Sequence, residues 1–211
     1  MTRDEGVALI KQVLGFRTGL DATIVTNMQF VQTTLELGPT RPHWLVSEDS
    51  FTTTLANDER IAVPVDFLEE IDQAVLKYVP DDTDDEEVDL DKEDYDVLRK
   101  NFRGRTPGPP EAYGLLGGYF RLFPTPDAVY TIRMIFYKKA AVLTSNIENE
   151  WMANNPMLLL GLAGGIVAIS LRDTVAKMEF DRWAQQGRVL QAAQATSRDM
   201  ANMEMQVGGP H

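Results

Sequence analysis

The first 40 residues place hydrophobic side chains three and four positions apart, which is the spacing of one face of an α-helix. One helix is predicted at residues 2–14, with Thr2 or Asp4 as its N-cap, and a second at residues 21–37, where a Gly-Pro pair stops it. Residues 1–40 are therefore expected to form the N-terminal helical hairpin of a bundle.

The polarity pattern changes after residue 40, where short β-branched and aromatic runs replace the helical spacing. Residues 51–55 and 60–63 flank a polar turn and are predicted to pair as a β-hairpin. Residues 66–77 fit either a helix or short strands, and residues 92–101 fit a short helix. This part of the chain is predicted to be rich in β-structure.

A second β-hairpin is predicted where the alternation of polarity is strongest. Residues 119–123 and 129–137 flank a five-residue connection, Pro124-Thr125-Pro126-Asp127-Ala128. Proline restricts φ and aspartate favours a turn, so this connection is expected to be the stiff tip of the hairpin.

Helical spacing returns at residues 143–196. Ser145 or Asn146 is a candidate N-cap, and Pro156 suits the first turn of an apolar helix that continues past Arg172. The strongly apolar part, residues 157–171, is shorter than the roughly 20 residues that a bilayer-spanning helix needs. A buried helix is therefore favoured over a membrane helix, with small residues that allow a neighbouring backbone to approach closely: Gly161, Ala163, Gly164 and Gly165.

The final segment, residues 197–211, lacks enough hydrophobic residues to form a core of its own. We expect it to be an extended tail that becomes ordered on a partner. Its candidate contact residues are Met200, Met203, Met205 and Val207.

The predicted fold class is α+β, mainly α: a helical bundle with an inserted small antiparallel β-rich part and an extended C-terminal tail. The expected boundaries are residues 1–40 for the N-terminal hairpin, 41–142 for the β-rich insertion, 143–196 for the C-terminal bundle helices and 197–211 for the tail.

Charge and composition limit the possible functions. The chain has 211 residues, with 20 Lys and Arg against 32 Asp and Glu, and a formal net charge of −12, which disfavours a surface that grips nucleic-acid phosphates. Cysteine is absent, which excludes disulfides, thiolate zinc sites and cysteine nucleophiles. The first residues do not resemble a secretory signal, so synthesis and residence in the cytosol are expected.

Candidate chemistry is sparse. The acidic segment 80–96 lacks the glycine of an EF-hand loop and is expected to be a solvated loop or short exposed hairpin. His43 and His211 have no partner at metal-ligand spacing. Gly117-Gly118 and Gly164-Gly165 do not match a phosphate-binding loop and are explained by a turn and a helix contact. No catalytic residue, metal or cofactor is therefore expected, and the chain is not predicted to be an enzyme.

Four motifs in order resemble phage head-to-tail adaptor proteins: "RPHWLVSEDSFTTTLANDERIAVPVDFL", "DKEDYDVLRKNF", "PEAYGLLGGYFRLFPTPDAVYTIRMIFY" and "NEWMANNPMLLLGLAGGIVA". The resemblance extends over residues 41–181, and "GGYFRLFPTPDAVYTIRMIFY" is its most distinctive part. It is weakest at the two ends of the chain.

The resemblance implies a virion protein at the head–tail junction. Such a protein forms a closed ring of about twelve subunits under the portal protein, contacts a downstream tail protein such as a nozzle or tail tube, and continues the DNA channel without binding DNA specifically. The tail residues named above are then expected to bind the portal, and Pro124, Thr125, Pro126 and Asp127 to contact a neighbouring subunit or the tail. An ordinary rigid turn is the equally favoured alternative for the last four.

Three other functions stay open at this point. Another virion ring, such as a head-completion or tail-terminator protein, would share the acidity and the oligomerisation. A tail-associated hydrolase would need a cleft with two positioned carboxylates. A membrane-anchored protein is the third.

Overall fold

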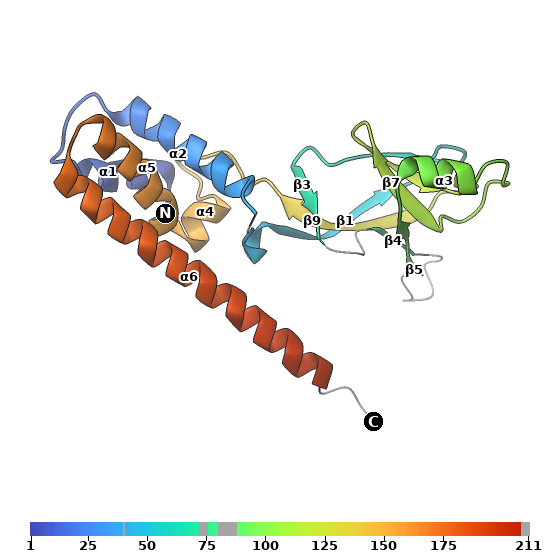
Figure 1. Ribbon diagram of the computed structural model, residues 1–211. Helices are drawn as coiled ribbons and strands as arrows, with labels where there is room; N and C mark the ends of the chain where they lie inside the picture. Colours follow the sequence, from blue (N-terminus) through green and yellow to red (C-terminus); the bar gives the residue numbers. More distant parts are fainter. Residues whose placement is uncertain (40, 72–75, 80–87, 208–211) are drawn as a thin grey trace. The chain divides into compact units, whose positions relative to one another are not determined.

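The computed structural model describes residues 1–39, 41–71, 76–79 and 88–207 (Figure 1). The chain divides into two compact units: unit 1 comprises Met1–Leu45 and Ala140–His211, and unit 2 comprises Val46–Lys139. Unit 1 is helical, and unit 2 holds all the described strands and one helix. The predicted α+β class, mainly α, is confirmed.

Unit 1 begins with the two predicted helices, α1 (Arg3–Val13) and α2 (Asp21–Glu36). A capping box starts α1: the Thr2 hydroxyl accepts from the Glu5 amide at 3.4 Å, and the Glu5 carboxylate accepts from the Thr2 amide at 2.8 Å. Gly15, with φ +71°, ends it in the left-handed conformation. A short 3-10 helix, η1 (His43–Leu45), is the last element of unit 1 before the chain enters unit 2.

The second half of unit 1 contains α4 (Glu150–Asn154), α5 (Pro156–Ser170) and α6 (Thr174–Val207). Pro156 lies in the first turn of α5, as predicted. The expected caps at Ser145 or Asn146 are wrong, because the side chain of Asn149 caps α4 and that of Asn155 caps α5.

The apolar helix does not continue past Arg172, contrary to the sequence prediction. Arg172 adopts φ +55°, and the amides of Arg172 and Asp173 donate to the carbonyls of Ile169 and Ala168. These are the two hydrogen bonds of a Schellman turn, which reverses the chain. The Asp173 carboxylate then accepts from the Ala176 amide at 3.0 Å in the first turn of α6.

Helices α5 and α6 pack antiparallel through glycines (Figure 1). A Cβ on Gly161 would lie 2.4 Å from the backbone nitrogen of Ala184, and one on Gly164 would lie 2.4 Å from the Phe180 ring. On α6, a Cβ on Gly187 would lie 2.5 Å from the Leu158 amide nitrogen. The expectation that small residues of the apolar helix allow close backbone approach is confirmed for Gly161, whereas Gly164 makes room for the Phe180 ring.

The backbone of residues 197–207 is helical, not extended as expected, because α6 continues to Val207. Residues 208–211 lie outside the described part of the chain.

The described residues of unit 2 form two sheets. The first has the order β1-β9-β4-β5, with β3 also paired to β9, and its strands are β1 (Val46–Thr53), β3 (Phe67–Glu70), β4 (Leu76–Val79), β5 (Val88–Asp89) and β9 (Thr131–Lys138). The second has the order β2-β8-β7-β6, and its strands are β2 (Arg60–Ala62), β6 (Asp91–Lys92), β7 (Ala112–Leu116) and β8 (Tyr119–Phe123). Helix α3 (Tyr95–Asn101) packs beside β7.

Both predicted hairpins are wrong, because the strands assigned to each pair in different sheets. β1 pairs with β9 and β2 with β8, so the segment between β1 and β2 crosses from one sheet to the other. The local hairpin of this region is β7–β8, which turns at Gly117 and Gly118 with φ +63° and +78°. Two consecutive residues with positive φ suit a two-residue hairpin loop, so the turn expected at this glycine pair is confirmed.

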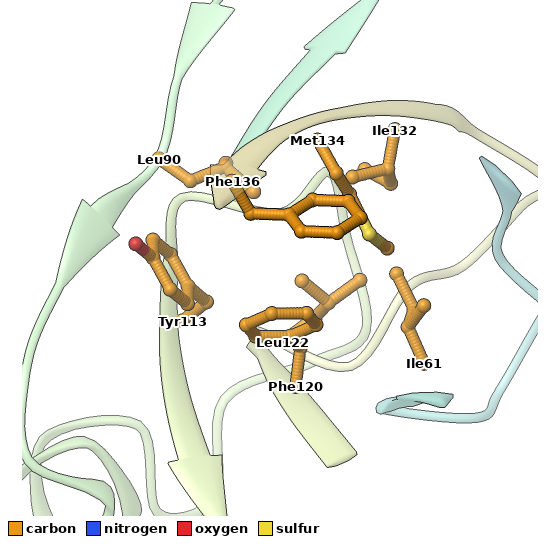
Figure 2. Close-up of a cluster of buried hydrophobic side chains, with 8 residues drawn as sticks. All are labelled: Ile61, Leu90, Tyr113, Phe120, Leu122, Ile132, Met134 and Phe136. Atoms are coloured by element: carbon orange, nitrogen blue, oxygen red, sulfur yellow. The ribbon is translucent and has the colours of Figure 1, made fainter. Parts of the chain in front are cut away.

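The core of unit 2 lies between the two sheets. Figure 2 shows Phe136 and Met134 of β9 facing Phe120 and Leu122 of β8. Leu90, between β5 and β6, is buried in the same cluster where the chain passes from the first sheet to the second. The remaining members are Ile61, Tyr113 and Ile132.

Candidate functional site

The Pro124–Asp127 segment connects β8 to β9 and is held by unit 2 itself. Pro124 and Pro126 are buried. The Thr125 carbonyl accepts from the Gly108 amide at 3.0 Å, and the Pro126 carbonyl accepts from the Asn57 amide at 2.7 Å. The segment is thus a crossover between sheets and not the tip of a hairpin.

Asp127 is the exposed member of this segment. Its carboxylate accepts a hydrogen bond from the Tyr130 hydroxyl at 2.5 Å, and Val129, two residues later, is also exposed. A contact with a neighbouring subunit or tail protein through residues 124–127, which stays a prediction, would therefore use Asp127, with Val129 beside it, and not the proline rings.

The expected portal-binding residues lie on the last turns of α6. The side chains of Met200, Met203, Met205 and Val207 are outside the part of the chain that the structure describes, so their role stays a prediction. Earlier on α6, Val189 and Leu190 are exposed. They follow Gly187, the last glycine of α6 that packs against α5.

The described residues offer little for catalysis or metal binding. They contain no group of three or more His, Asp and Glu side chains placed to hold a metal ion. Within the same ranges, no helix combines the length and apolarity needed to cross a bilayer. Two exposed surfaces in the described part of unit 1 are candidate binding sites.

The outer face of α2 is the first such surface. Thr26, Phe30, Thr33 and Leu37 follow each other along the exposed side of the helix, and Phe30 and Leu37 are 61% and 68% exposed. No residue from 22 to 35 is charged, although 25% of the chain is. Protein interfaces are depleted in charge at their centre and enriched in aromatic residues, so this face has the composition of an interface.

A groove between α1 and α6 is the second surface. Its volume is about 1010 Å³, and its apolar wall includes Leu9, Val13, Val175, Met178 and Trp183. Val175 and Met178 are 78% and 73% exposed. An ion pair at 3.0 Å between Arg17 and Asp173, both of which line the groove, connects the loop after α1 to the start of α6.

The SU10 adaptor protein family matches residues 13–208, which include unit 2 and most of unit 1 but only the last residue of α1. The chain belongs to the SU10 adaptor protein family. Among curated proteins, none matches the chain.

Family membership confirms the resemblance to phage adaptors drawn from residues 41–181 and extends it toward both ends of the chain. It makes the protein a phage adaptor, which is a structural component of the virion.

The adaptor also has a buried polar cluster that the sequence did not reveal. Glu36 at the end of α2 accepts hydrogen bonds at one carboxylate oxygen from Gln32 at 2.9 Å, the Ala140 amide at 3.2 Å and the Trp151 indole at 3.3 Å. The side-chain amide of Asn149 donates to the side-chain oxygen of Gln32 at 3.0 Å. Burial raises the pKa of Glu36, and the nearby charge of Glu150 raises it further.

This cluster ties α2 to the chain that enters α4. Gln32, Glu36, Asn149 and Trp151 are all buried, so the cluster sits within unit 1 and serves its packing. The sequence analysis did not single out the exposed face of α2, although the absence of charge from residue 22 to 35 is visible in the sequence.

Proposed function

We propose that this protein is the head-to-tail adaptor that binds beneath the portal, closes into a ring of about twelve subunits and continues the DNA channel toward the tail. The observation that carries the proposal is the family match over residues 13–208. A structural adaptor family favours this function over a tail-associated hydrolase.

Helix α6 supports the portal contact. Its glycine-mediated packing against α5 ends near Gly187, yet the helix continues to Val207. At 1.5 Å per residue, the remaining turns project about 30 Å. A helix end that extends beyond its own bundle is a suitable element for docking on another protein. Here the partner is the portal, and the contact residues are Met200, Met203, Met205 and Val207.

The charge of the chain supports the conduit. A ring repeats the net charge of −12 in every subunit. A negatively charged wall repels DNA phosphates, so DNA passes through without adhering. The lower face of the ring contacts the next tail protein.

Truncation tests the portal contact. A chain that ends at Thr196 should lose portal binding in a pull-down with the purified portal of the same phage, while its thermal unfolding stays close to that of the full chain because the α5–α6 contact is retained. Full-strength binding by the truncated chain would refute portal docking through the end of α6.

A further inference from the structure

The helical unit carries two different surfaces that suit a protein partner. We infer that, in the ring, the outer face of α2 of one subunit lies in the α1–α6 groove of the next subunit. This inference rests on the proposed ring and names the surfaces that close it.

The symmetry of a ring requires two different patches on each subunit. A closed ring of more than two subunits uses head-to-tail contacts, in which one patch meets a different patch on the neighbour. A contact between two α2 faces would be two-fold and would stop at a dimer. The unit therefore needs two distinct patches, and helix α5 separates two candidates, with α2 on one side of it and α6 on the other (Figure 1).

Both surfaces present exposed apolar side chains. The α2 face presents Phe30 and Leu37 on a helix side without charge. The groove presents Val175 and Met178 on α6. Its charged lining residues form two ion pairs, Arg17 with Asp173 and Arg182 with Glu179. Protein interfaces combine such apolar side chains with charged ones. Exposed apolar side chains on both surfaces would be removed from water by the same contact.

The α2 face and the α6 wall of the groove have similar lengths. From Thr26 to Leu37 the α2 face runs eleven residues, about 16 Å along the helix axis. The α6 wall of the groove runs from Asp173 to Trp183, about 15 Å. The two surfaces are thus matched in length, and the occupant that fits is a second copy of this chain.

Cross-linking tests the contact directly. The chain has no cysteine, so an introduced thiol is unique. Thr33→Cys places a thiol on the exposed side of α2, and Met178→Cys places one on the groove wall. The full chain, assembled on the portal of its phage, is treated with a short bis-maleimide and run on a denaturing gel.

A head-to-tail contact makes three predictions for that gel. The chain with both substitutions gives a ladder of multimers, an equimolar mixture of the two single variants gives species no larger than dimers, and each single variant alone gives monomers. Dimers from Thr33→Cys alone would overturn the inference, because they indicate that two α2 faces meet.

A second variant adds an independent readout. Phe30→Asp places a charge at the centre of the α2 face and should reduce the ring fraction on portals by about tenfold or more, as expected for a central aromatic residue of an interface. Val65→Asp, at a site in unit 2 that is even more exposed than Phe30, is the control and should assemble normally. Normal assembly of Phe30→Asp would also overturn the inference.

Electron microscopy of the same samples separates the two claims. Rings on portals without cross-links from the double variant reject this interface and leave the adaptor ring intact. Absence of rings from the unsubstituted chain rejects the proposed ring itself, and the interface with it.

Discussion

Gly161 of α5 lies directly against the backbone of Ala184 on α6: a Cβ at position 161 would come within 2.4 Å of the Ala184 nitrogen and 2.8 Å of the Phe180 carbonyl oxygen. Backbone atoms of a packed helix cannot move aside as the end of a flexible side chain can. The glycine therefore sets the distance between the two helices.

Gly161→Ala should destabilise the protein by about 1–3 kcal/mol, because the added methyl group forces α5 and α6 apart. The matched control is Gly165→Ala on the same helix, where the new Cβ would meet only Lys177 carbons at 3.7 Å, an ordinary contact. That change should be neutral or should stabilise the helix by up to about 1 kcal/mol. Thermal unfolding followed by circular dichroism measures both. Equal effects at the two positions would contradict the packing described.

Arg172→Gly should raise the free energy of unfolding by about 0.5–1 kcal/mol, because Arg172 holds φ +55° in the turn between α5 and α6. Its side chain is exposed, so little packing is lost. Arg172→Ala keeps the unfavourable conformation and should change stability little. Denaturant unfolding of the three chains provides the comparison, and a destabilised glycine variant would be the contrary result.

The buried carboxyl of Glu36 should give stability a specific pH dependence. Its folded pKa is raised above the ordinary value of 4.5 by burial, so between 4.5 and the folded pKa the folded state binds more protons than the unfolded state. The contribution of this group to stability therefore falls as pH rises through that window. At lower pH the carboxyl is protonated in both states and contributes no slope.

Glu36→Gln should remove that contribution, since the amide carbonyl can accept from the same donors but does not ionise. The unfolding free energy of the unsubstituted chain should fall more steeply between pH 4.5 and 7 than that of the variant. Denaturant unfolding at several pH values measures the difference. If the unfolding free energies of the two chains changed in parallel with pH, the pKa of Glu36 would not be raised in the folded state.

The helices were predictable from sequence because their signals are local. Thr2 and Glu5 form a capping box three residues apart, and Pro156 stands in the first turn of α5, so each boundary is encoded within one turn of the chain. The turn at Arg172 was missed because a non-glycine residue takes the left-handed conformation there and the helical spacing resumes after it.

Strand pairing was not predictable in the same way. β1 meets β9 about 80 residues later in the sequence, and no short-range pattern encodes that register. The two prolines after β8 suggested a hairpin tip, but they mark a buried crossover whose hydrogen bonds come from Gly108 and Asn57. The Gly117-Gly118 pair was the true hairpin signal.

Surface function was partly legible. The uncharged run of α2 is visible in the sequence, and the helical spacing of Ile24, Met28 and Val31 predicts the buried face, but the exposure of Phe30 and Leu37 follows only from the structure. The groove could not be inferred, because it joins side chains of α1 and α6 that are more than 150 residues apart.

The most direct test of the proposed function is electron microscopy of the purified chain with and without the portal of its phage. The proposal predicts a hollow ring of this protein on the portal, coaxial with the DNA channel. Portals that carry isolated copies of the chain, or none, would contradict it.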